Sequence, residues 1–202
     1  MKRFLFFLLF FSVNFLPAQN VDIHWLRCIS QPYNPQLDNA MKFTSNSVAP
    51  AMIGIPVGIL TYDLIRHSSM DAKRKPLVIV ASLATTSVIT FGLKYSVNRP
   101  RPYHTYPDIQ KKGNGGSESF PSGHTSNAFA LATSISLEYP KWYFIVPSYM
   151  WACTVGYSRM RLGMHYPSDV FAGAVIGAGC AWGCWWLNRK LFQPKSSAVN
   201  SQ

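Results

Sequence analysis

Five apolar runs of helical length, separated by short polar loops, constrain this chain more than any other feature. They occupy residues 51–65, 77–93, 126–137, 142–157 and 170–187. Runs of this length suit helices rather than strands, and each is shorter than the roughly 20 residues of an ideal transmembrane helix. Tilted helices, or helices in a thin membrane, are therefore expected if the runs cross lipid.

The apolar runs predict an all-α, membrane-embedded bundle of five to six helices, with the helical domain at residues 51–190 and a polar tail at 191–202. Residues 1–18 combine a basic start, a Phe/Leu run and Pro17-Ala18, which is typical of a signal peptide, or of a short uncut N-terminal anchor. In both cases residues 19–50 form an exported loop or amphipathic segment, with a short helix near 37–43.

The charges between the runs predict an orientation. Loop 66–75 is basic, and Arg189, Lys190 and Lys195 follow the last run. The positive-inside rule places both segments on the cytoplasmic side, so that 94–121 and 158–169 emerge on the exported, periplasmic face of the inner membrane. Much of the net charge of +11 is then a topology signal. No nucleic-acid partner is expected, because no basic helix is interleaved with exposed aromatic residues.

Three polar stretches at the edges of these runs carry the chemistry. They are Lys94 with Arg101-Pro102, then Pro121-Ser122-Gly123-His124, and then Ser158-Arg159 followed by His165 and Asp169. Together they supply three cations, two imidazoles and a carboxylate, which is the inventory needed to bind a phosphate and transfer it to and from a histidine.

Each stretch taken alone has an ordinary structural explanation. Pro-Ser-Gly is a common helix start, although free N–H groups there also bind anions. Asp169 lies four residues after His165 and can accept its Nδ1–H, or can simply cap a helix beside a satisfied histidine. Lys94 and Arg101 can be interfacial side chains at a helix end.

Taken together, the three stretches have characteristic spacings. Six residues separate the Lys from Arg-Pro in the first stretch, and the second is Pro-Ser-Gly-His. In the third, five residues separate Ser-Arg from the His, and three more separate the His from the Asp. In this pattern the chain closely resembles the type 2 phosphatidic acid phosphatase family, which is related to the vanadium-dependent haloperoxidases. The motifs span residues 94–169, and the helical plan extends the resemblance to most of the chain. The segments 120–130 and 162–173 resemble the membrane-embedded branch.

The resemblance implies a role for each motif residue. His165 attacks phosphorus and forms a phosphohistidine, oriented by Asp169, and protonated His124 donates to the leaving alcohol. The phosphate oxygens are held by two groups of residues, Lys94, Arg101 and Arg159 as cations and Ser122 and Gly123 through Oγ and N–H. No metal and no other cofactor is implied.

The resemblance also implies a metal-independent phosphatase acting on a phosphomonoester or pyrophosphate of a lipid or polyprenyl carrier, with the bilayer as its surroundings. Short apolar runs leave open a soluble exported acid phosphatase, and a vanadate-dependent haloperoxidase or a non-enzymatic membrane protein are further alternatives. No oligomeric state is predicted. Lys111, Lys112 and Arg161 are expected at the solvated surface. The cysteines show no metal spacing, and those in apolar runs are expected to be buried.

Overall fold

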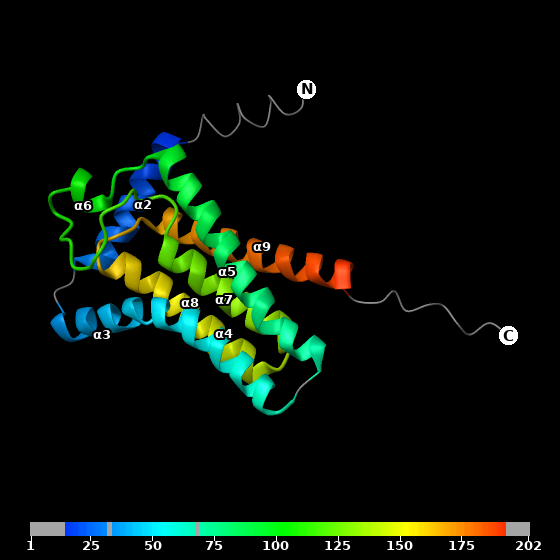
Figure 1. The fold of residues 1–202 in the computed structure, drawn as a ribbon. Helices are drawn as coiled ribbons and strands as arrows, with labels where there is room; N and C mark the ends of the chain where they lie inside the picture. The colour runs from blue at the N-terminus through cyan, green and yellow to red at the C-terminus, as the bar shows by residue number, and fades with distance from the viewer. Residues whose placement is uncertain (1–14, 32–33, 68, 193–202) are drawn as a thin grey trace, which may run out of the picture.

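The computed structural model describes residues 15–31, 34–67 and 69–192, and these residues form helices and loops with no strand (Figure 1). The predicted signal or anchor falls mostly on residues 1–14, and the predicted polar tail falls mostly on 193–202, both outside the described residues. The helices are α2 (Phe15–Ser30), α3 (Pro35–Asn46), α4 (Val48–Ile65), α5 (Met70–Val97), α6 (Pro102–Thr105), α7 (Gly123–Glu138), α8 (Trp142–Arg161) and α9 (Pro167–Phe192).

The five predicted apolar runs are confirmed as α4, α5, α7, α8 and α9. The segments Val48–Ile65, Met70–Thr105 and Pro167–Phe192 are long and apolar enough to cross a membrane. Their outer faces carry large apolar side chains, such as Val88, which is 71% exposed, and Phe171, which is 73% exposed. Lipid rather than water suits such a surface, which favours the membrane-embedded fold over the soluble alternative.

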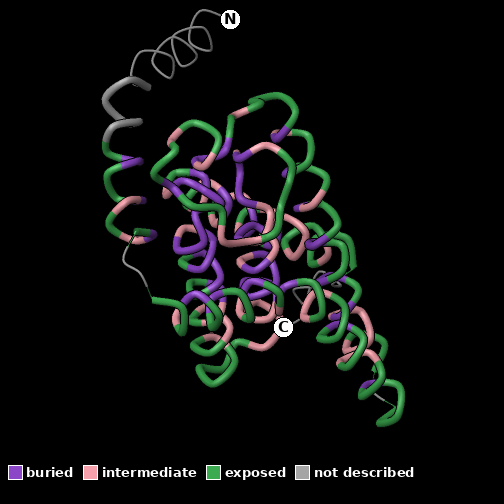
Figure 2. The backbone as a smooth tube through the Cα atoms, turned by 90° about the vertical axis from the view of Figure 1, so that its left-hand side faces the viewer, coloured by how far each residue is buried: buried purple, intermediate pink, exposed green. Residues whose placement is uncertain are grey.

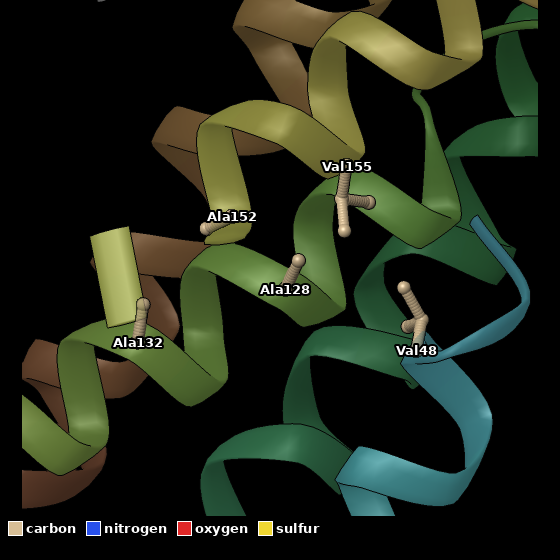
Figure 3. Packing of buried hydrophobic residues seen from close by; sticks show 5 residues of the cluster. All are labelled: Val48, Ala128, Ala132, Ala152 and Val155. Atoms are coloured by element: carbon tan, nitrogen blue, oxygen red, sulfur yellow. The ribbon is translucent and has the colours of Figure 1, made fainter. Parts of the chain in front are cut away.

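Helix α7 lies in the middle of the bundle and packs against α5, α8 and α9 (Figure 1). Figure 2 shows that buried residues are gathered in the middle of the bundle. Figure 3 shows one of the contacts of α7, in which its Ala128 and Ala132 face Ala152 and Val155 of α8, beside Val48 at the start of α4. Small side chains here allow the helices to approach closely. The apolar run at 126–137, which is rich in Ser and Thr, is therefore the central helix of the bundle.

The contact between α7 and α9 requires glycine at two positions. A Cβ atom at Gly177 would lie 2.0 Å from the carbonyl oxygen of Ser126, and one at Gly173 would lie 2.8 Å from that of Ser122. The two backbones therefore touch, as in small-residue contacts between membrane helices. This contact holds the N-terminal end of α9 against the N-terminal end of α7, where both contribute to the site described below.

Helices α2 and α3 occupy the segment predicted as an exported loop. Helix α3 includes the short helix expected near 37–43, and Asn34 begins it by accepting a hydrogen bond from the Leu37 N–H at 3.0 Å. Helix α2 was not predicted. Its Ile23 and Leu26 are buried against Ile109 and Tyr166, which lie far away in the sequence. Both helices lie at the same end of the bundle as loop 98–122 (Figure 1).

Candidate active site

Four helix ends meet at this end of the bundle and carry the three motifs. Helices α5 and α8 finish there, and α7 and α9 begin there. His124, the second residue of α7, feels the charges of Lys94, Arg101 and Arg159 and lies near the ring of His165. The structure therefore brings the predicted site residues of all three motifs into one place.

Loop 114–118 holds the three cations in position. The Lys94 Nζ and the Arg101 Nε each donate to a carbonyl of this loop at 2.5 Å, and the Arg159 guanidinium approaches a third carbonyl at 3.4 Å. The acceptors are Glu118, Ser117 and Asn114, in that order. Exposure is 9% for Lys94, 5% for Arg101 and 2% for Arg159, so a bound anion would meet cations that are already positioned and poorly hydrated.

The first turn of α7 supplies N–H donors beside these cations. The N–H groups at the start of a helix have no partner within the helix, and they point toward an approaching anion. Gly123 lies directly beside Lys94, because a Cβ atom there would be in ordinary contact with the Lys94 Cε, at 4.0 Å. The Ser122 hydroxyl, predicted to contact phosphate, is paired with the Thr125 hydroxyl at 2.8 Å.

His124 is neutral at neutral pH. Burial first, and then the positive charges of Arg159, Arg101 and Lys94, together lower the pKa of His124 to about 3. The imidazole precedes the apolar run of α7 and lies close enough to all three cations to feel their charges. The sequence-based role requires a protonated ring, so proton uptake must accompany anion binding.

His165 lies in the loop between α8 and α9 and is 2% exposed. Its Nδ1 is 2.7 Å from the Ser119 carbonyl oxygen and 3.6 Å from the Asp169 Oδ2. A carbonyl can only accept, so Nδ1 carries the hydrogen and Nε2 keeps its lone pair. Burial lowers the pKa of His165 to about 4, partly offset by Asp169, so the ring is neutral at neutral pH and suited to nucleophilic attack.

Asp169 therefore acts on His165 mainly through Ser119 and not through the direct hydrogen bond expected from the sequence. The Ser119 hydroxyl donates to the Asp169 Oδ2 at 2.5 Å, while the carbonyl of the same residue accepts from His165. The Tyr166 N–H also donates to this carboxylate, at 3.0 Å. Asp169 is completely buried, so these bonds fix its position.

Arg99 completes this network and was not singled out in the sequence. Its NH1 is 2.6 Å from the Asp169 Oδ1, and its NH2 is 2.8 Å from the Asp22 Oδ2. Its guanidinium also lies 3.9 Å from the centre of the Tyr166 ring. The signal in the sequence was its place in Arg99-Pro100-Arg101-Pro102, where prolines restrict the backbone around both arginines.

Asp22 connects α2 to the same network. Its carboxylate accepts from the Ser168 N–H at 2.9 Å and from the Ser168 hydroxyl, at the start of α9. It thereby caps α9 and pairs with Arg99 at the same time. The unpredicted helix α2 is tied in this way to the helix end that carries Asp169.

The expectation that Lys112 and Arg161 are solvated is wrong. Arg161 is 2% exposed, and its Nε lies 2.7 Å from the Asp38 Oδ1. The Lys112 Nζ lies 3.1 Å from the Asp38 Oδ2. Burial acts to raise the pKa of Asp38, but the two cations outweigh it and hold the pKa below its usual value. This cluster fastens α3 to α8 beside Arg159, whose NH1 donates to the Ser45 hydroxyl of α3.

The part of the chain that the structure describes contains no group of three His, Cys, Asp or Glu side chains able to hold a metal ion. The expected burial of the cysteines in apolar runs is wrong, because Cys153 is exposed and Cys180 and Cys184 are partly exposed.

A family model described as the PAP2 superfamily matches residues 75–193, more than half of the chain. The "Lipid A 4'-phosphatase" of Bacteroides thetaiotaomicron is 39% identical over 77 residues, which cover 38% of this chain and 34% of that protein. The chain spans between about a third and two thirds of the length of the first curated relatives it matches.

Two solved structures share the fold. The crystal structure of LpxE from Aquifex aeolicus superposes with a TM-score of 0.69 at 27% identity, covering 81% of this chain and 94% of that one. A transmembrane PAP2-type phosphatidylglycerolphosphate phosphatase from Bacillus subtilis superposes with a TM-score of 0.75 at 22% identity, covering 95% and 96%. The likeness to a transmembrane protein agrees with the apolar outer surface, and the chain is a membrane protein.

Proposed function

The chain belongs to the PAP2 superfamily, and we propose that it is a phosphatase that hydrolyses a phosphomonoester or pyrophosphate carried by a membrane lipid or polyprenyl alcohol. The observation that carries this proposal is the buried His165, whose Nδ1 hydrogen is committed to the Ser119 carbonyl at 2.7 Å. A neutral imidazole with a free Nε2, set among three positioned cations, is suited to attack a phosphate.

In the first step the His165 Nε2 attacks phosphorus and the bond to the lipid oxygen breaks. His124 gives its proton to that oxygen, so the lipid leaves as a neutral alcohol, or as a monophosphate when the substrate is a diphosphate. Lys94, Arg101 and Arg159 stabilise the phosphoryl oxygens throughout. This step leaves a phosphohistidine.

In the second step His124, now neutral, removes a proton from water, whose oxygen attacks the phosphohistidine. The bond between phosphorus and the His165 Nε2 breaks, and inorganic phosphate forms. The three cations supply the positive charge that a metal provides in other phosphotransfer enzymes, so we propose that no metal takes part.

We also propose that the site faces the exported side. The opposite end carries the basic turn after α4 and the basic end of α9, as the positive-inside rule requires of a cytoplasmic end. At the site end several basic side chains are paired instead, including Arg27 with Asp108 and Arg99 with Asp22. A variant with Cys28 as its only cysteine should react with a membrane-impermeant maleimide in intact cells. A single-cysteine Arg66→Cys variant should react only after permeabilisation, and the reverse result would invert the orientation.

The function is tested by phosphate release from lipid phosphates, polyprenyl diphosphates and soluble phosphate esters presented to the detergent-solubilised protein. His165→Ala should abolish release, whereas EDTA should leave it unchanged. Full activity in His165→Ala would end the nucleophile assignment, and loss of activity with EDTA would end the metal-independent one. Equal turnover of soluble esters and lipids would contradict a lipid substrate.

A further inference from the structure

A groove of about 690 Å³ lies between α4, α7 and α8, and it is separate from the phosphatase site. Its walls are apolar and include Ile55, Ile59, Leu131 and Ile135. It contains none of the residues placed above in the phosphate site. A volume of this size is in the range of pockets that hold small ligands.

The groove extends toward the end of the bundle opposite the active site. Along α4 its lining runs from Ala51 to Asp63, which at 1.5 Å per residue corresponds to a length of about 18 Å. Asp63 lies two residues before the end of α4, and Tyr139 lies just after the end of α7. The groove therefore reaches from the interior of the bilayer to the surface of the leaflet that is farther from the active site.

Asp63 is the unusual residue in this lining. It is 7% exposed, and within the described residues its Oδ2 is buried without a hydrogen-bond partner. A buried carboxylate oxygen is costly unless a donor or a cation satisfies it. An occupant that supplies an N–H donor with a positive charge would remove this cost.

Other charges gather at the same mouth. Among the described residues, the Glu138 Oε1 is also buried without a hydrogen-bond partner. Burial raises the pKa of the Tyr139 hydroxyl, and the negative charges of Asp63 and Glu138 act in the same direction. The Lys75 ammonium lies 4.6 Å from the centre of the Tyr139 ring and donates to the Glu138 carbonyl at 3.2 Å. Acidic and basic groups thus stand side by side where the groove opens.

We propose that this groove binds a phospholipid whose headgroup carries a primary ammonium beside its phosphate, taken from the leaflet opposite the active site. One apolar chain lies along the groove, the ammonium pairs with Asp63, and the phosphate lies toward Lys75. Charge complementarity selects this headgroup, because a lipid with a purely anionic headgroup would leave the Asp63 carboxylate unpaired and add a second negative charge beside it.

Two glycines of α4 provide a matched pair of variants. Gly58 lines the groove, and a Cβ atom there would meet nothing within 4 Å, so Gly58→Leu fills the groove without a clash in the folded protein. Gly54 is one helical turn away, is equally open and does not line the groove, so Gly54→Leu is its control. For the charge, Asp63→Asn is paired with Asp71→Asn, whose carboxylate is 89% exposed at the same end of the bundle.

The experiment is native mass spectrometry of the full-length, detergent-solubilised protein titrated with phosphatidylethanolamine or with phosphatidylglycerol of the same chains. The wild type should bind phosphatidylethanolamine about tenfold more tightly, the difference expected for a hydrogen bond to a charged group. Asp63→Asn should bring the two lipids to equal affinity. Gly58→Leu should weaken both, whereas Gly54→Leu and Asp71→Asn should bind like the wild type.

Phosphatase activity shows that each variant is folded, since none of these residues belongs to the proposed catalytic machinery. Equal affinity of the wild type for the two lipids would overturn the proposal. So would an unchanged preference in Asp63→Asn, or equal binding losses in Gly58→Leu and Gly54→Leu. The binding result stands independently of whether the protein hydrolyses lipid phosphates.

Discussion

The proposed general acid must gain a proton when an anion enters the site. Burial and three nearby cations lower the pKa of His124 to about 3, so its ring is neutral near pH 7 before an anion binds. A general acid works best when its pKa lies near the working pH, which here means a rise to about 7. At about 1.4 kcal/mol for each tenfold change in protonation, this rise of about four pKa units requires about 5.5 kcal/mol of coupling between proton binding and anion binding.

A bound phosphate can provide that coupling. A dianion about 4 Å from an imidazolium gains about 8 kcal/mol at the effective dielectric constant of about 20 that suits protein sites. This attraction exceeds the requirement, so anion binding near neutral pH should take up about one proton at His124.

Isothermal titration calorimetry measures this uptake when binding is repeated in buffers with different ionisation enthalpies. Tungstate is a suitable probe, because it is a tetrahedral dianion with no proton of its own near neutral pH. His124→Gln should bind it without proton uptake, whereas His24→Gln, which changes an exposed histidine of α2, should behave like the wild type. Tight binding by the wild type with no proton uptake would refute the assignment of His124 as the acid.

Three further predictions concern the residues around the nucleophile. Arg99→Met leaves the fully buried Asp169 without its cation, so we expect a loss of about 3–5 kcal/mol in thermal unfolding in detergent, and an unchanged midpoint would contradict the network. Ser119→Ala keeps the carbonyl that accepts from His165 but removes the hydroxyl bonded to Asp169. The substitution should lower kcat about tenfold or more at unchanged KM. A change in KM alone would show that Ser119 does not help to position His165. Because burial lowers the pKa of His165 to about 4, the acid limb of kcat/KM should be centred near pH 4, as a proton blocks the attacking nitrogen. An acid limb centred near pH 6.5 would show that His165 is not held neutral.

The helical plan was predictable because it depends on local composition. A long apolar run in lipid must satisfy its backbone hydrogen bonds within itself, so each of the five runs had to become a helix. The motifs were also local, since Lys94, His124, Arg159 and His165 each stand at the edge of a run. Alternation of the runs across a membrane then predicted that these edges meet at one end, as the structure shows.

Helix α2 and the burial of Arg161 were not predictable in this way. The apolar partners of α2, Ile109 and Tyr166, lie far away in the sequence. Its Asp22 likewise finds its partners at Arg99 and Ser168. Arg161 is buried because Asp38, in a helix far away in the sequence, pairs with it. Contacts of this kind depend on which helices lie next to each other, and no window of sequence contains them.

By itself the sequence determined the helices, the side chains available for phosphate chemistry and the end of the bundle where they gather. Tertiary structure alone decided how those side chains work together. The Asp169 carboxylate acts through Ser119 because Gly173 and Gly177 allow α9 to touch α7, which brings the segment before α7 between Asp169 and His165. Hydrogen bonds depend on differences of less than an ångström, and only the packing of the backbones sets distances on that scale.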